Sequence, residues 1–96
     1  MKPLEKWQLT LFAAADEVET RGLAQGTWRD KDDRTCPIAA INAVAATPEA
    51  QRLAKLALAR KIGNVIAWSD MPGRTAEEVA AMLRSTAMAP VEVLAA

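Results

Sequence analysis

Cys36 is the one cysteine of this 96-residue chain and its most reactive side chain. It directly precedes Pro37, where we expect a helix to begin, and a helix N-terminus favours the reactive thiolate form of cysteine. A nucleophilic cysteine normally needs a base such as histidine, and the chain has no histidine. Activation would fall to Asp70 or a lysine, which is weaker chemistry. We therefore predict a small buried thiol or helix cap, with a catalytic or redox thiol as the alternative.

Three carboxylates, Asp30, Asp32 and Asp33, fall within four residues and could offer oxygen ligands to calcium or magnesium. The spacing of a calcium-binding loop is not met, because Arg34 and Ile41 occupy the fifth and twelfth positions counted from Asp30. Basic residues are interleaved with these acids, which favours a solvated loop of balanced charge. We predict no metal and no cofactor.

Trp28 and Arg29 lie in a polar stretch where no periodic apolar pattern calls for an aromatic side chain. Tryptophan and arginine are both enriched at the energetic centres of protein interfaces. The more common outcome for a single tryptophan is to fold back over a small core, so both interpretations stay open. If Trp28 is an interface residue, Trp28 and Arg29 bind a protein partner.

The stretch WSDMPGRTAEEV begins at Trp68 and combines an aromatic residue, an acid, a Pro-Gly turn and an arginine. Thr75 and Glu78 have the spacing of a capping box, which starts a helix. Asp70 and Arg74 lie four residues apart across the turn and could form an ion pair. The favoured interpretation is a structural corner in which Trp68 fills the core and Asp70 fixes the turn through backbone hydrogen bonds. The alternative is a binding corner formed by Trp68, Asp70 and Arg74.

Asn42 is a lone polar residue in the apolar stretch Cys36–Ala46. A buried amide must find hydrogen-bond partners, and we expect one in Asp70 or in a backbone group of the polar loop. A small-molecule or enzymatic site around Cys36, Asn42, Trp68 and Asp70 is the main alternative to protein binding.

Helices separated by short turns are expected to position these residues. The first should span Pro3 to Arg21, with Pro3 in its first turn and Gly22 just past its end. Its apolar face follows a 3.6-residue period and comprises Leu4, Trp7, Leu11, Ala14, Ala15 and Val18. Residues 22–35 then form a surface loop, because they are rich in Gly, Asp and Arg and lack periodicity.

The second helix is predicted to start at Thr35 or Cys36, with Pro37 in its first turn. It should be central and buried, because small residues allow its neighbours to approach closely. These residues are Ala39, Ala40, Ala43, Ala45 and Ala46.

The third helix should begin at Pro48, capped by Thr47, and end near Ile62 before Gly63. Its buried face should comprise Leu53, Leu56 and Ala57.

Residues 64–70 favour about two helical turns, although a short strand also fits their apolar pattern. A last helix should run from Ala76 to about Ala87 and end before Pro90, leaving residues 89–96 as a tail. Its buried residues should be Val79, Met82 and Leu83. The sequence therefore predicts a compact single all-α domain, residues 1–96, of four or five short helices.

Charge and hydropathy disfavour two classes of partner. The twelve Lys and Arg residues balance the twelve Asp and Glu residues, whereas a nucleic-acid-binding domain normally carries a basic excess. A helix-turn-helix interpretation of Ala59 and Gly63 is weak, because the segment that follows is short and begins with apolar residues. A weak DNA-binding regulator is thus the third hypothesis. No membrane association is expected, because the longest apolar run, Cys36–Ala46, is far below the ~20 residues that cross a bilayer.

The N-terminal sequence lacks the continuous apolar core of an export signal, and a single cysteine cannot form an internal disulfide. We predict a cytoplasmic protein, as a monomer or homodimer.

Four features between about Leu11 and Leu83 form a recognisable pattern: FAAADEVETRG in the first helix, a Gly-bearing loop, a Cys-led Ala-rich second helix, and the corner Trp-x-Asp-x-x-Gly-Arg-Thr-x-x-Glu-Val. In this pattern the chain resembles small helical proteins of unknown function from actinobacteria and their bacteriophages. Those proteins typically have Cys-x-x-Gly-Ala and Trp-Asn-Asp, where this chain has CPIAA from Cys36 and WSD from Trp68. The resemblance implies the helical fold and an actinobacterial or phage source, and it implies no activity.

The leading hypothesis is a non-enzymatic cytoplasmic accessory module that binds another protein. The binding surface would be the loop Gly22–Thr35, together with the corner Trp68–Thr75. If the chain is encoded by a bacteriophage, the partner would be a host protein.

Overall fold

The computed structural model describes residues 3–89 of the chain. Five α-helices and no β-strand make up this part, apart from isolated bridges in the loop after the first helix. The helices are α1 (Lys6–Arg21), α2 (Pro37–Val44), α3 (Pro48–Ile62), α4 (Val65–Ser69) and α5 (Ala76–Ala87). The predicted all-α fold is confirmed. Of the predicted tail, residues 89–96, only Ala89 lies within the described residues.

α1 begins later than the sequence suggests. The predicted place of Pro3 in its first turn is wrong, because the cap is Glu5, whose backbone N–H donates to the side chain of Gln8 at 2.7 Å. Leu4 therefore precedes the helix and is 40% exposed. The rest of the predicted apolar face is buried and comprises Trp7, Leu11, Ala14, Ala15 and Val18. Gly22 ends the helix with a φ of 92°, in the left-handed region that favours glycine.

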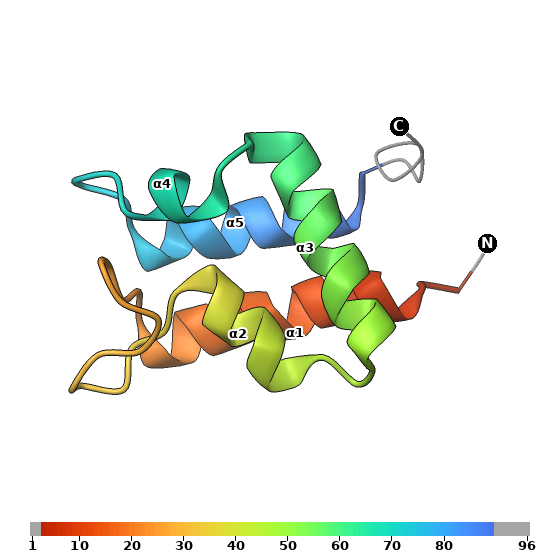
Figure 1. The fold of residues 1–96 in the computed structure, drawn as a ribbon, viewed down its shortest axis with the longest axis horizontal. Helices are drawn as coiled ribbons and strands as arrows, with labels where there is room; N and C mark the ends of the chain where they lie inside the picture. Colours follow the sequence, from red (N-terminus) through yellow and green to blue (C-terminus); the bar gives the residue numbers. More distant parts are fainter. Residues whose placement is uncertain (1–2, 90–96) are drawn as a thin grey trace.

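α1 and α5 run side by side along the long axis of the molecule and share its most extensive helix contact (Figure 1). Val79 and Leu83 of α5 are buried in this contact as predicted, and Met82 is half-buried against the core. The predicted capping box is also present, since Thr75 Oγ1 accepts from Glu78 N–H at 3.1 Å and Glu78 Oε1 accepts from Thr75 N–H at 3.1 Å.

α2 packs mainly against α1, and the expectation of a central, buried helix is only partly right (Figure 1). Cys36 caps it and Pro37 occupies its first position, as the sequence predicts. Its buried residues are Pro37, Ala40 and Ile41. Ala43 is exposed on the outer face of the helix, and Ala46, which is also exposed, lies beyond its end.

α3 is capped by Thr47 and closed by Gly63, both as predicted. Its buried face is rotated from the expected one, since Leu53 and Leu56 are only half-buried. The buried residues are Ala50, Ala54, Ala57 and Leu58. α3 runs across α1 and α5 rather than along them (Figure 1), and alanines at the crossing allow the backbones to approach closely.

α4 is the predicted short helical segment, with five residues and Asn64 as its cap. A single turn and a half is too short for a DNA recognition helix, which agrees with a plain helical hairpin of α3 and α4. The loop 22–35 and the turn 70–75 lie at the same end of the molecule, opposite the start of α1 (Figure 1). Among residues 3–89, no helix is both long enough and apolar enough to cross a membrane.

Candidate binding site

Backbone hydrogen bonds close the 22–35 loop on itself. Ala24 N–H donates to Thr35 O at 3.1 Å, and Thr35 N–H donates to Gly22 O at 3.0 Å. Cys36 N–H donates to Trp28 O at 2.9 Å, which holds the middle of the loop against the start of α2. The predicted surface loop therefore has a fixed backbone.

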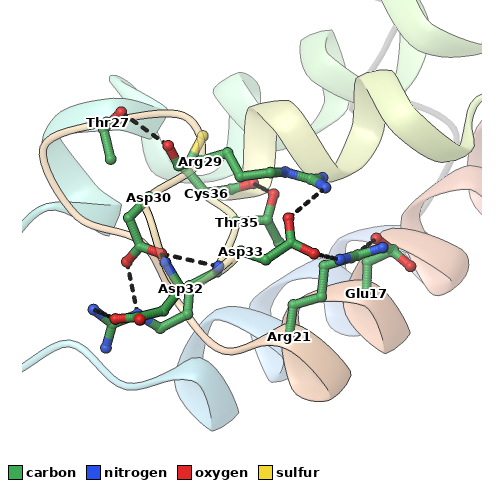
Figure 2. Close-up of polar contacts among 10 residues, drawn as sticks. Glu17, Arg21, Thr27, Arg29, Asp30, Asp32, Asp33, Thr35 and Cys36 are labelled. Atoms are coloured by element: carbon green, nitrogen blue, oxygen red, sulfur yellow. Dashed lines mark hydrogen bonds and ion pairs between the residues drawn. The ribbon is translucent and has the colours of Figure 1, made fainter.

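Asp30 braces the acidic part of the loop (Figure 2). Its Oδ1 accepts from the backbone N–H groups of Asp32 and Arg34, both at 3.0 Å, and its Oδ2 accepts from Arg34 Nε at 2.6 Å. Burial raises the pKa of the Asp30 carboxyl, but the hydrogen bonds from Arg34 and Asp32 outweigh it, so the pKa lies below its ordinary value. Within residues 3–89, no three His, Cys, Asp or Glu side chains are gathered as metal ligands.

Arg29 belongs to a chain of ion pairs that ties the loop to α1 (Figure 2). Arg29 Nη1 contacts Asp33 Oδ1 at 3.3 Å, Asp33 also pairs with Arg21, and Arg21 Nε contacts Glu17 Oε2 at 2.8 Å. The two neighbours that the sequence groups as one site therefore have different roles. Arg29 is engaged in the loop, whereas the Trp28 side chain is 59% exposed.

Gln25 and Gly26 join the loop to the corner after α4. Gln25 Nε2 donates to the backbone oxygens of Ser69 at 3.0 Å and Met71 at 2.9 Å. Gly26 N–H donates to Asp70 Oδ1 at 3.0 Å. Asp70 thus fixes backbone, as expected, but the backbone is that of the distant loop rather than of its own turn.

Arg74 forms no ion pair with Asp70, and the suggested bridge across the Pro-Gly turn is wrong. Instead Arg74 Nε donates to Trp68 O at 3.1 Å, Nη1 contacts Glu78 Oε2 at 3.2 Å, and the guanidinium lies 4.0 Å from the centre of the Trp68 ring. Trp68 is half-buried and packs against the core. Trp68 and Arg74 are therefore structural partners of each other.

A hollow of about 120 Å³ lies where the loop meets the end of α4. It is lined by loop residues 26–28, by Cys36, and by Ile66, Ser69 and Asp70. Two large apolar residues that line it are exposed, Trp28 at 59% and Ile66 at 50%, and Met71, which follows Asp70 in the chain, is 52% exposed. Trp28 does not fold back over the core. We call Trp28, Ile66, Met71 and this hollow the loop–corner face.

The predicted alternative site around Cys36, Asn42, Trp68 and Asp70 is not assembled. Cys36 and Asp70 line the hollow, whereas Asn42 accepts a hydrogen bond from Gln51 of α3, not from Asp70 or the loop as expected. Cys36 is 4% exposed, and its Sγ accepts from Ala39 N–H at 3.4 Å as the cap of α2. The geometry gives Cys36 the role of a buried thiol and helix cap.

Residues 4–89 match the model of DUF6197, a family of unknown function. The chain belongs to DUF6197. The match includes all five helices and both parts of the loop–corner face. None of the curated proteins and none of the solved structures gives a significant match to the chain.

Three residues of this DUF6197 site were missed by sequence reasoning: Gln25, Ile66 and Met71. Ile66 belongs to a helix of five residues, which is too short for its pattern to show which face is exposed. Met71 precedes a Pro-Gly turn, and connecting segments run over the surface, so its position in the turn is the signal that indicates its exposure. Nothing local marks Gln25, because its hydrogen-bond partners are 44 and 46 positions away.

Proposed function

We propose that this DUF6197 protein is a non-enzymatic module that binds another protein through its loop–corner face. The observation that carries the proposal is the exposure of Trp28, at 59%, on a backbone that Cys36 N–H fixes in place. Large apolar side chains gathered on a soluble surface mark interaction sites, and tryptophan contributes more binding energy than most other residues. A fixed backbone lowers the entropy lost on binding.

The neighbours of Trp28 support the proposal. Ile66 comes from α4 yet lines the hollow together with Trp28, and Met71 lies in the turn after α4, next to Asp70 of the same hollow. The hydrogen bonds of Gln25 to Ser69 and Met71 hold the two segments together. An apolar surface built from two segments in this way is preformed, as most protein-binding surfaces are.

An enzymatic or small-molecule role at the hollow beside Cys36 is less well supported. Pockets for small molecules usually have volumes of about 300–1,000 Å³, and the hollow at Cys36 has about 120 Å³. Two of the four residues of that alternative, Asn42 and Trp68, do not line it. A reactive thiol would be revealed by rapid alkylation of native Cys36 near neutral pH.

A DNA-binding role also has little support. The arginines of the loop and of the corner pair with neighbouring acids, among them Arg29 with Asp33, Arg34 with Asp30 and Arg74 with Glu78. Retention on duplex DNA that falls steeply with salt would favour this role over protein binding.

The source implied by the sequence resemblance, an actinobacterium or its bacteriophage, would make a bacterial protein the natural partner. For a phage-encoded chain, the proposal is an accessory protein that acts on a protein of its host. A cytoplasmic location and a monomeric or homodimeric state remain predictions from the sequence, and the oligomeric state can be measured by light scattering.

The test is capture of proteins from bacterial extract by the wild-type chain and by three variants. Trp28→Ala should lose the captured partner, because it removes the central exposed side chain. Arg29→Ala should retain it, since Arg29 is engaged with Asp33. Leu9→Ala is the matched control, because Leu9 is a large apolar residue that is 53% exposed on α1, outside the loop–corner face.

Loss of the partner must then be reproduced with purified components, after circular dichroism has shown that the variants are folded. A partner that binds wild type and Trp28→Ala equally, or no reproducible partner, would contradict the proposal. A partner lost in Leu9→Ala but retained in Trp28→Ala would place the interface on α1.

A further inference from the structure

Asp70 differs from the other partly buried acids of the chain. Within residues 3–89 the half-buried carboxylates are Glu17, Asp30 and Asp70. Glu17 pairs with Arg21 at 2.8 Å and Asp30 pairs with Arg34 at 2.6 Å. Among the described residues, Asp70 accepts a hydrogen bond only from the Gly26 N–H and forms no ion pair. A partly buried charge without a counter-charge is a place where a cation would be stabilised.

The neighbouring arginines do not serve Asp70. Arg29 contacts Asp33, and Arg74 contacts Glu78 while its guanidinium lies over the Trp68 ring. Neither arginine lines the hollow. Both arginines therefore neutralise other acids, and the Asp70 carboxylate is left available to a cation from outside this part of the chain.

The hollow beside Asp70 has the chemistry to hold the rest of a basic side chain. Trp28 and Ile66 line it together with Asp70, which combines an aromatic ring, an aliphatic surface and one carboxylate. Lysine and arginine bury apolar stems while their charged ends pair with acids, and both cations are attracted to the face of an indole ring. A volume of about 120 Å³ accommodates a side chain but not a whole peptide.

We propose that the hollow of the loop–corner face accepts one arginine or lysine side chain of the partner protein. The guanidinium or ammonium group pairs with the Asp70 carboxylate, and the apolar stem packs between Trp28 and Ile66. The proposal rests on the function proposed above and specifies it further. The partner presents a basic side chain surrounded by apolar ones that cover Trp28, Ile66 and Met71.

The test titrates the protein with three capped amino acids: N-acetyl-arginine N-methylamide, the corresponding lysine derivative, and the neutral norleucine derivative. Binding is followed by nuclear magnetic resonance at the Trp28 indole N–H and the Gly26 amide. We expect the two cationic probes to shift both signals at millimolar concentration, and norleucine to bind several-fold more weakly. Added salt should weaken the cationic probes and leave norleucine unchanged.

Asp70→Asn is the decisive variant, because Asn Oδ1 can still accept from Gly26 N–H while the negative charge is gone. We expect about a fivefold or greater loss of affinity for the cationic probes, as for removal of a charge-assisted hydrogen bond. Glu49→Gln is the matched control. It removes the same charge from an exposed acid in the first turn of α3, outside the hollow, and should change nothing.

Several results would overturn the proposal: no saturable shift with the cationic probes, equal binding of norleucine, equal binding by Asp70→Asn, or no effect of salt on the wild-type protein. The salt series needs no variant, so it decides the matter even if Asp70→Asn disturbs the loop. In the capture experiment, a partner that is lost in Trp28→Ala but fully retained in Asp70→Asn would contradict the proposal that a basic side chain enters the hollow. The proposal of protein binding would still stand. A partner that is retained in both variants would contradict the proposed binding face and the proposed basic side chain alike.

Discussion

The helical body and the loop–corner face of this chain are held together by different forces. The body, built by α1, α3 and α5, buries Leu11, Leu58, Leu83 and their neighbours almost completely. The loop–corner face leaves Trp28, Ile66 and Met71 exposed, and hydrogen bonds from Gln25 and Gly26 fix its backbone. Apolar burial is strong but not directional, whereas hydrogen bonds are weaker and fix position. The molecule therefore has its buried core at one place and a group of exposed large apolar side chains at another.

The largest effect is expected from a substitution in the core of the helical body. Leu11→Ala should lower the free energy of unfolding by about 2–5 kcal/mol, because it removes a fully buried side chain and leaves a cavity. Leu11 is 0% exposed between the helices of the core. Urea unfolding followed by circular dichroism measures the loss.

The contrast between the two regions also requires that the folded fraction of Leu11→Ala keeps the structure of the loop–corner face. The Gly26 amide should therefore have the same chemical shift in Leu11→Ala as in wild type. A displaced Gly26 signal would show that the body and the face are one cooperative unit, and the comparison would then fail.

The fold of the body could be predicted because its signals act over short distances. A cap such as Thr47, a closing glycine such as Gly63 and the capping box of Thr75 and Glu78 each act within four residues. The rotation of α3 could not be predicted in the same way. Which of Leu53 and Leu58 is buried depends on the angle at which α3 crosses α1, and this angle is a property of the whole packing.

Only part of the candidate site was predictable from the sequence, and its assembly was not. The sequence pointed to Trp28 and Asp70 for sound local reasons, namely an aromatic residue without an apolar pattern and an acid beside a turn. It paired Asp70 with Arg74, four positions away, whereas the structure pairs Asp70 with Gly26, 44 positions away. Contacts over such separations depend on the tertiary fold, which periodicity and capping do not encode.

A substitution in the loop should destabilise the loop–corner face locally and leave the helical body nearly unchanged. Gln25→Ala removes two hydrogen bonds between the loop and the corner, to Ser69 O and Met71 O. We expect the free energy of local opening at Gly26 to fall by about 1–2 kcal/mol, while global unfolding changes much less. Native-state hydrogen exchange of the loop amides measures the first, and urea unfolding measures the second.

Thr27→Ala is the matched control for Gln25→Ala, because Thr27 Oγ1 makes only a long bond of 3.4 Å to Arg29 O. It should leave exchange at Gly26 unchanged. Equal protection in Gln25→Ala and wild type would mean that the Asp70 contact alone holds the loop to the corner.

The third prediction uses acid to loosen the face. Hydrogen bonds from Arg34 and Asp32 lower the pKa of Asp30 in the folded protein, in spite of the opposing effect of burial. A depressed pKa means that the stabilisation is complete above the ordinary carboxyl pKa and is lost as the pH falls through the folded value. Amides of residues 30–35 should therefore lose protection at acid pH before those of α1 and α5.

Asp30→Asn should flatten that acid dependence, since the titrating group is gone. Asp32→Asn is its control, because the Asp32 side chain is 62% exposed and its contact to Arg34 is 3.6 Å long. If Asp32→Asn flattened the acid dependence as strongly as Asp30→Asn, the loop brace would be assigned to the wrong carboxylate.

The smallest effect on stability is expected at Trp28, and it is the most direct test of the difference between the helical body and the loop–corner face. Trp28→Ala should change the free energy of unfolding by no more than about 0.5 kcal/mol, as for substitutions of exposed residues, because the fold uses the backbone oxygen of Trp28 rather than its ring. The core of the body depends on Trp7, which is 1% exposed, whereas the exposed ring of Trp28 should contribute little to folding, as the proposed binding role requires. A loss of stability comparable to that of Leu11→Ala would show that the ring is structural, and the division between a stabilising body and a binding face would have to be abandoned.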